Sequence, residues 1–366
     1  MKKLISLILV LVCGVGCASN EGEPTEISDN FDRNAMLVNW ADNIIIPSYE
    51  NYVGTLVSLD AALTSFTSQS DLAGLIQLRE KWLASYLAFQ QVSMFEIGPA
   101  ETLSLRNYTN VFPADTQEIE GFINSGEFNL SLPSTNDAQG FPALDYLLFG
   151  MADTDTEILN KLSEAKTINF MSALVTKLKS MSEEVLNEWK ENYRDTFLAN
   201  NGTTSSSSVN KLMNDFLYYY ERSLRAGKIG IPAGVFSGSP LSNRVEGLYS
   251  QVYSKQLFNE ALEATINFFT GKHFGSSSKG TSIEDYLQYL SEINSTEDLS
   301  LSIINQFEAA RLMAQQLKDN FFEQIETDNA TMLKTYDELQ KNVILMKVDM
   351  FQKMNVRIDY VDADGD

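Results

Sequence analysis

Cysteine is nearly absent from this 366-residue sequence, which holds only Cys13 and Cys17, both close to its start. The rest of the chain therefore has no thiol that could form a disulfide, act as a nucleophile or bind a soft metal. A secreted protein without disulfides depends on its hydrophobic core for stability. About 350 residues are enough to bury such a core, and this length predicts roughly two domains.

Histidine is equally scarce, because His273 is the only one in the sequence. It lies in the segment Gly271–Gly275, and we expect it to be a solvated loop residue. The chain has no HExxH sequence, no marked nucleophilic serine and no glycine-rich phosphate loop, which argues against zinc peptidases of that type, triad hydrolases and P-loop proteins. The ligands that remain for a metal are carboxylate, tyrosine and carbonyl oxygens, which suit hard cations and ferric iron.

The first seventeen residues have the layout of a secretory signal. Lys2 and Lys3 precede the apolar run Leu4–Val12, which is too short to span a bilayer as a mature helix. Small residues then lead to Cys17, and a cysteine at this place is typical of a lipobox, where it is acylated. We therefore predict a lipoprotein signal peptide over 1–17, with a lipid on Cys17 that anchors the protein in the cell envelope, on the periplasmic or surface face of the outer membrane.

Basic residues are few, since 27 Lys and Arg stand against 49 Asp and Glu, and the formal net charge is −22. Such a surface repels nucleic-acid phosphates and anionic lipid headgroups. We exclude nucleic acid as a partner and expect contact with the membrane through the lipid anchor. The small, polar and acidic residues 18–27 predict a flexible tether between the anchor and the folded body.

Strand-like alternation is confined to the short stretch Val356–Tyr360, whereas helical periodicity recurs along the whole chain. Apolar residues three or four positions apart mark one face of a helix. The clearest stripes are Leu75, Leu78, Trp82, Tyr86, Phe89; Leu174, Leu178, Met181, Val185, Trp189; Ile303, Phe307, Ala310, Ala314, Leu317, Phe321; and Met332, Tyr336, Leu339, Val343, Met346, Met350. Helices with an apolar stripe must pack on one another, so we predict an all-α fold of helical bundles.

Proline is sparse, and none interrupts residues 155–199, which permits a single helix of roughly forty residues. The polar segment 200–208, with the sequence NNGTTSSSS, is the best candidate for a linker. We therefore predict an N-terminal helical bundle over 28–205 and a C-terminal helical bundle over 206–366.

One segment, Gln139–Gly150, combines glycine and proline with about two turns of predicted helix. Gly140 can take a backbone conformation that is closed to other residues, and Pro142 suits the first turn of a helix. Asp145 shares a helix face with Pro142 and complements the helix dipole, which gives it a structural role. A carboxylate at this place can also be a ligand, so both roles stay open.

The sequence GFPALDYLLFG resembles the GxHxxE motif of imelysin-like proteins, the insulin-cleaving membrane protease family. Gly140 matches the motif glycine, Pro142 occupies the histidine position and Asp145 replaces the glutamate. Further stretches resemble the family, including its bacteroidete branch, in the same order along the chain: Ile45–Tyr49, Trp82–Pro99, Phe112–Asp115, Lys228–Pro232, Gly238–Leu241 and Arg357–Asp366. Together they cover essentially the whole chain after the signal peptide.

The resemblance implies two bundle-like domains, with a site at the motif near their junction, and a cell-envelope role linked to the acquisition of iron or haem. The site residues that it implies are Gly140, Pro142 and Asp145 in the motif and Tyr49, Trp82 and Glu96 in a pocket. Asp145 is the candidate metal ligand. Ser93 stands where the family has a glutamate, and Glu96 lies close enough along the chain to replace it.

Proline has no side-chain ligand atom, so a metallopeptidase built on the motif histidine loses that ligand at Pro142. We therefore predict a non-catalytic lipoprotein that binds iron, haem or a partner in an outer-membrane metal-uptake system. Two alternatives stay open: a metallopeptidase of the imelysin type, and a protein-interaction module whose motif is only structural.

Overall fold

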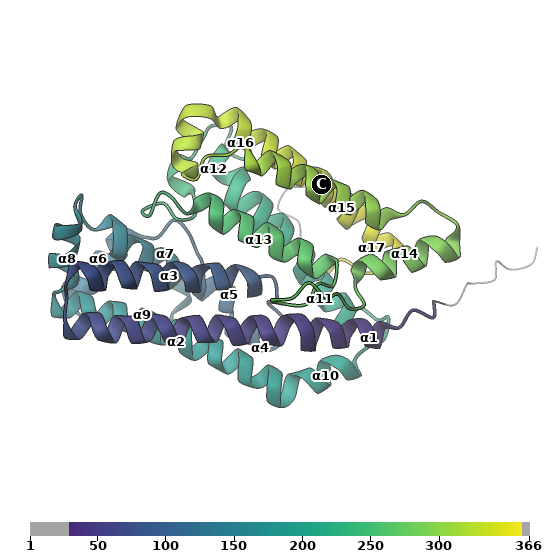
Figure 1. Ribbon diagram of the computed structural model, residues 1–366, viewed down its shortest axis with the longest axis horizontal. Coiled ribbons are helices and arrows are strands. Elements are labelled where there is room, and N and C mark those ends of the chain that lie inside the picture. The colour runs from purple at the N-terminus through teal and green to yellow at the C-terminus, as the bar shows by residue number, and fades with distance from the viewer. Residues whose placement is uncertain (1–28, 361–366) are drawn as a thin grey trace, which may run out of the picture. The chain divides into compact units, whose positions relative to one another are not determined.

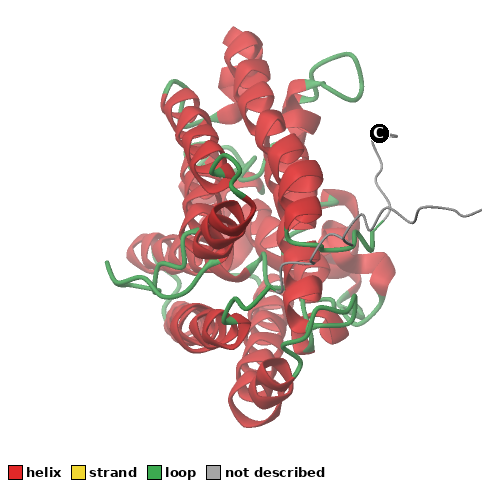
Figure 2. Cartoon of the chain, turned by 90° about the vertical axis from the view of Figure 1, so that its right-hand side faces the viewer, coloured by secondary structure: helices red, strands yellow, loops and turns green. Residues whose placement is uncertain are grey.

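The computed structural model describes residues 29–360. The predicted signal peptide with Cys17, the tether 18–27 and the acidic end 361–366 lie outside the described residues. From Phe31 onward the described residues form one compact unit. Every regular element in this unit is a helix, and the described residues contain no β-strand, as Figure 2 shows. The predicted all-α fold is confirmed.

The helices fall into two sets along the chain. The first set comprises α1 (Arg33–Val38), α2 (Ile46–Ser68), α3 (Leu72–Val92), α4 (Pro99–Leu103), α5 (Leu105–Thr109), α6 (Thr116–Ser125), α7 (Gly140–Asp145), α8 (Asp155–Leu162), α9 (Ala165–Glu188) and α10 (Arg194–Ala199), with the π-helical segments η1 (Asn39–Ile45), η3 (Tyr146–Gly150) and η4 (Trp189–Tyr193) and the 3₁₀ helix η2 (Pro133–Ala138). The second set comprises α11 (Ser208–Tyr218), α12 (Ile231–Ala233), α13 (Ser254–Phe269), α14 (Ile283–Asn294), α15 (Leu299–Gln315), α16 (Phe321–Ile344) and α17 (Phe351–Lys353), with the π-helical segments η5 (Tyr219–Gly230) and η7 (Leu345–Met350) and the 3₁₀ helix η6 (Ser242–Arg244).

Polar side chains fix where several helices begin. Asp71 accepts a backbone N–H in the first turn of α3, and Asp115 accepts two in the first turn of α6. Ser207 and Ser282 cap α11 and α14 in the same way. The first N–H groups of a helix lack partners within the helix, so each such cap contributes about 1 kcal/mol.

The four apolar stripes predicted from the sequence lie in the core, and all their residues except the half-buried Met181 are buried. Burying one large aliphatic or aromatic side chain stabilises the fold by about 1.5–3 kcal/mol. All three tryptophans, Trp40, Trp82 and Trp189, are fully buried as well. This core, built without a disulfide among the described residues, holds the helices together.

Figure 1 shows α2, α3 and α9 running side by side, with α2 packed on both of the others. The helices α13, α15 and α16 form a second group, in which α15 packs on α13 and on α16. The two groups meet where α13 lies against α3. No helix in the described part of the chain is both long and apolar enough to cross a membrane.

One detail differs from the prediction, namely the length of a helix. The single helix expected over 155–199 is broken after α8, because Glu164 takes an extended conformation before α9 begins. The stretch Val356–Tyr360 forms no strand. The predicted linker lies between α10 and α11, and its residues 200–206 are exposed. The division into bundles at 205 and 206 stays a prediction.

Candidate functional site

The motif segment forms the short helix α7, and all its residues are buried. Gly140 has a φ angle of +72°, and a Cβ atom there would lie 2.1 Å from the carbonyl oxygen of Thr109. A residue with a side chain therefore cannot replace Gly140 unless the backbone moves. Pro142 lies in the first turn, where its missing N–H removes no helical hydrogen bond. The sequence features of this segment thus serve close packing.

Asp145 ends α7, and only 2% of its surface is exposed. Its Oδ2 accepts the backbone N–H of Tyr249 at 2.9 Å, and its Oδ1 accepts that of Ser250, also at 2.9 Å. Burial raises the pKa of Asp145 to about 7, and the two backbone donors oppose this rise. Asp145 therefore ties α7 to the loop that follows η6.

The surroundings of Asp145 do not fit the metal site that the resemblance implies. Both carboxylate oxygens already face N–H donors, and Pro142 offers no ligand atom. Within residues 29–360, no group of three or more His, Cys, Asp or Glu side chains is placed to hold a metal ion. Metal binding by Asp145 stays a prediction that metal titration can test.

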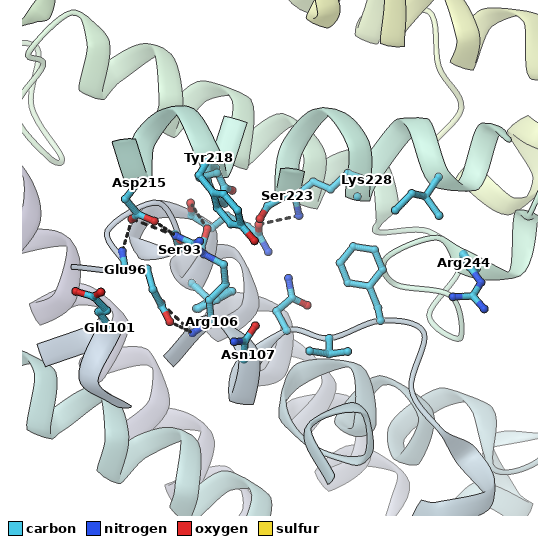
Figure 3. Close-up of a pocket in the computed structure, with 18 residues that line it drawn as sticks. Ser93, Glu96, Glu101, Arg106, Asn107, Asp215, Tyr218, Ser223, Lys228 and Arg244 are labelled. Carbon is cyan, nitrogen blue, oxygen red and sulfur yellow. Dashed lines mark hydrogen bonds and ion pairs between the residues drawn. The ribbon is translucent and has the colours of Figure 1, made fainter. Parts of the chain in front are cut away.

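A cavity of about 480 Å³ lies between α3, α5, α11 and η5 (Figure 3). A volume of this size suits a small organic ligand. Its polar lining residues are Gln90, Ser93, Glu96, Glu101, Arg106, Asn107, Asn110, Asp215, Ser223, Lys228 and Arg244, and its aromatic ones are Phe89, Phe112, Tyr218 and Tyr219.

Arg106 organises one end of the cavity. Its guanidinium Nη2 lies 2.9 and 3.1 Å from the two carboxylate oxygens of Asp215, and its Nε donates to the carbonyl of Ser93 at 2.7 Å. Its backbone N–H donates to the carboxylate of Glu96 at 3.0 and 3.1 Å. Burial raises the pKa of Glu96 to about 7, although the nearby Arg106 charge lowers it. Arg106 therefore has both its side chain and its backbone engaged.

Lys228 and Glu246 form a second, more deeply buried ion pair, in which each side chain is 3% exposed. Lys228 also donates to Gln90 Oε1 at 2.9 Å. Glu246 Oε1 accepts from Asn110 Nδ2 at 2.7 Å and from Gln90 Nε2 at 3.3 Å. Burial lowers the pKa of Lys228, and the charge of Glu246 opposes this effect. The amide partners matter because a buried ion pair offsets its desolvation only when its remaining polar atoms are satisfied.

The helix α7 supports the cavity wall from behind. The ring of Phe141 stacks on that of Tyr86, with centroids 4.6 Å apart and planes 10° apart. The hydroxyl of Tyr86 donates to Asn110 Oδ1 at 2.5 Å, and Asn110 in turn donates to Glu246. Motif and cavity are therefore parts of one packed and hydrogen-bonded unit.

Of the predicted site residues in the described part of the chain, Glu96 alone lines this cavity. Trp82 is fully buried, and its Nε1 donates to the carbonyl of Phe141 at 3.2 Å. Tyr49 is also fully buried, and its hydroxyl donates to the carbonyl of Phe95 at 3.5 Å. These two side chains pack in the core of the first set of helices, and neither lines the cavity.

Sequence reasoning missed the four charged residues that shape the cavity, namely Arg106, Asp215, Lys228 and Glu246. A signal existed for Asp215, because it interrupts the mainly apolar stretch 212–220, and a charge on a buried helix face indicates a partner. Lys228 follows three other charged residues within 221–228, so its burial had no sign in the sequence. Arg106 and Glu246 lie in short or irregular segments without periodicity, so no pattern identified them.

His273 lies in a loop, as expected, but the loop is not freely solvated. The residue is half-buried, and its Nε2 has no hydrogen-bond partner among the described residues. It lines a second cavity, of about 360 Å³. The backbone N–H of Phe274 donates to the carbonyl of Asn43 at 2.8 Å, and Asn39 Nδ2 donates to the carbonyl of Gly271 at 3.1 Å. These contacts hold the loop against η1.

The sequence also matches a known family. The model of the family described as imelysin, peptidase M75, matches residues 45–345. Iron-regulated protein A of Synechococcus elongatus is 22% identical over 203 residues, which are 53% of this chain and 52% of that protein. The chain therefore spans about half the length of this curated relative.

Two solved structures share the fold. An imelysin-like protein from Psychrobacter arcticum superposes with a TM-score of 0.72 at 16% identity, over 90% of this chain and 97% of that one. A putative iron-regulated protein A precursor from Parabacteroides distasonis gives 0.71 at 17% identity, over 87% and 95%. At such identities the likeness shows the fold alone.

Proposed function

Because the chain belongs to the imelysin family, we propose that it is a non-catalytic binding protein of the cell envelope that acts in iron acquisition. Its ligand, haem or a ferric chelate, binds in the cavity between α3, α5, α11 and η5. The observation that carries this proposal is the cavity itself, about 480 Å³ in volume and lined by charged, polar and aromatic side chains. Concave sites with a few convergent polar groups are typical of small-molecule binding.

The link to iron in this proposal comes from the names of the relatives. The Synechococcus protein is named iron-regulated protein A, and the Parabacteroides structure is described as a putative precursor of such a protein. The chain's own residues add that, after Cys17, it has no cysteine and only one histidine. Its donors are therefore mainly oxygen atoms, which suit ferric iron and its chelates.

The geometry of α7 favours binding over hydrolysis. A catalytic metal centre of the zinc peptidase type needs about three protein ligands and an open position. Pro142 supplies no ligand, and the oxygens of Asp145 accept N–H groups of Tyr249 and Ser250. This supports a binding role in which the motif is structural.

The ligand proposal is tested by calorimetry on the full-length lipoprotein in detergent. Haem and ferric citrate serve as organic iron complexes, and ferric, ferrous, calcium and zinc ions serve as bare metals. We expect an organic complex to saturate one site and the bare ions to give no saturable heat. If neither haem, ferric citrate nor any other ferric chelate tested binds, the proposed function is wrong.

The peptidase alternative is tested by incubating the protein with unfolded insulin chain, with and without a chelator. We expect no cleavage. Cleavage that the chelator and Asp145→Ala both abolish would replace the binding role with a catalytic one.

The proposed location rests on Cys17, which lies outside the described residues. We propose that its lipid anchors the protein to the outer membrane, where an uptake system is the partner. Radiolabelled palmitate should label the wild-type protein and leave Cys17→Ala unlabelled. Equal labelling of both proteins would exclude Cys17 as the anchor.

A further inference from the structure

Three of the six charged residues in the cavity wall are already in ion pairs. Arg106 pairs with Asp215, and their side chains are only 14% and 12% exposed. Lys228 pairs with Glu246 at a still more buried position. A ligand could use these four groups only by breaking the pairs, which would leave an uncompensated buried charge.

Two other charged lining residues are available. Glu101 and Arg244 are both exposed, and neither makes an ion pair or a side-chain hydrogen bond within the described residues. They lie at opposite ends of the cavity in Figure 3. Glu96 lies close to Glu101, whose charge contributes to the raised pKa of Glu96 after burial, the main cause. The cavity therefore has an acidic end and a basic end.

Among the described residues, no ion pair links a lysine to Glu101 at the acidic end. Lys211 and Asp359 line an adjoining cavity of about 230 Å³ together with Glu96 and Glu101. The charge of Lys211 acts on Asp359 and stabilises that carboxylate, whereas no ion pair links Lys211 to Glu101 in the described structure. Glu101 is thus free to attract a cationic group from the ligand.

The wall between the two ends carries no unpaired charge. Tyr218 and Phe112 contribute aromatic faces, and Asn107 contributes an amide. The guanidinium of Arg106 lies 5.8 Å from the centre of the Tyr218 ring. Such a wall suits an uncharged, partly apolar middle portion of a ligand.

We propose that this cavity binds an elongated amino-carboxylate, with its amine at Glu101 and its carboxylate at Arg244. Arginine binds a carboxylate through two parallel hydrogen bonds, and the opposite charges fix the direction in which the ligand lies. The inference rests on the proposed function and narrows its ligand to a ferric chelate that carries, besides its iron-binding oxygens, one free ammonium group and one free carboxylate, whereas haem has no amine. Free amino-carboxylates share this chemistry, so the test includes both forms.

The probes are unbranched ω-amino carboxylic acids of increasing chain length, and a ferric hydroxamate chelate that carries a free terminal amine and a free terminal carboxylate, each titrated into the full-length lipoprotein in detergent. The N-acetyl and methyl-ester derivatives remove one charge each. We expect one chain length to bind best and each derivative to bind about tenfold more weakly, because one charge-assisted contact is worth about that factor. Tighter binding of the ferric hydroxamate chelate than of any amino acid would identify the chelate as the ligand, and equal or weaker binding would identify the free molecule.

The variants Glu101→Gln and Arg244→Gln separate the two ends. Glu101→Gln should weaken binding of the amino acid about tenfold and leave binding of the N-acetyl derivative unchanged. Arg244→Gln should weaken binding of the amino acid about tenfold and leave binding of the methyl ester unchanged. The exposed Glu127, which lines none of these cavities, supplies the control Glu127→Gln, expected to bind like wild type. The double variant Glu101→Arg and Arg244→Glu should restore binding, with the ligand lying in the opposite direction in the cavity.

Two results would overturn the inference. One is the absence of binding by the ferric hydroxamate chelate and at every chain length, and the other is equal binding by both variants and the control. If haem still binds in either case, the proposed function stands and only the amino-carboxylate is wrong. If haem, ferric citrate and the ferric hydroxamate chelate all fail to bind, both proposals fall.

Discussion

The carboxylate of Asp145 accepts the backbone N–H of Ser250 at 2.9 Å, across more than a hundred residues of sequence. Ser250 lies in the loop that also carries Glu246, the partner of Lys228 at the cavity. The residue at the glutamate position of the family motif thus fixes a loop that shapes the binding cavity. This bond explains why a carboxylate is present although Pro142 cannot assist it in holding a metal.

Removal of the Asp145 carboxylate should destabilise the fold. Asp145→Ala leaves the buried N–H groups of Tyr249 and Ser250 without acceptors, at a cost of about 1–3 kcal/mol for each. We expect the free energy of unfolding in urea to fall by about 2–4 kcal/mol. Asp145→Asn keeps one acceptor oxygen and should lose less. An unchanged unfolding curve together with lost metal binding would instead make Asp145 a ligand.

Gly140 should tolerate no side chain, whereas another glycine should accept one. In Gly140→Ala the new Cβ would collide with the carbonyl of Thr109, so we expect a loss of about 3 kcal/mol or more. Gly121 lies within α6, and a Cβ there meets nothing within 4 Å. Gly121→Ala should therefore raise stability by about 0.5–1 kcal/mol. Equal effects of the two substitutions on the urea midpoint would show that Gly140 is not sterically restricted.

The buried pair of Lys228 and Glu246 should show strong coupling. Lys228→Met leaves the Glu246 charge buried without its partner, and Glu246→Leu does the same to Lys228. We expect each single variant to lose about 3–5 kcal/mol of unfolding free energy. The double variant should lose clearly less than the sum, with a coupling energy of about 2 kcal/mol or more in a double-mutant cycle. Simple additivity would contradict the pairing.

Stability should depend on pH through Asp145 and Glu96. Burial raises the pKa of each to about 7, above its value in the unfolded chain, so the folded state holds these protons more tightly. Their contribution to stability is therefore complete below about pH 4 and is lost as the pH rises through about 7. Urea midpoints should fall between pH 5 and pH 8. The fall should be smaller in Asp145→Asn and in Glu96→Gln, and identical slopes in all three proteins would refute this assignment.

The sequence predicted the helices well because their apolar stripes are long and regular. The stripes through Trp82 and Met332 both lie in the core as expected. Boundaries were harder to place where local conformation decides them. At Glu164 a single extended residue separates α8 from α9, and no proline or glycine marks that break in the sequence.

The site was less predictable because its residues come together only in the folded chain. The motif drew attention to Asp145, yet the cavity depends on ion pairs between residues far apart, such as Arg106 with Asp215. Glu96 was found because it lies in the stretch Trp82–Pro99, which resembles the family. A buried charge can be suspected from a sequence, whereas its partner depends on how the helices pack.

The exposed loop 201–206 has a practical consequence for engineering. This loop separates the two sets of helices along the chain. Hydrogen bonds nevertheless join the sets, because Asp145 of α7 accepts from Ser250 and Asn39 of η1 donates to Gly271. A chain cut within 201–206 should yield two fragments that stay associated without a covalent link and copurify from one affinity tag. Reporter halves fused at the cut ends would then be reassembled by the fragments, which makes this fold a natural split-protein scaffold.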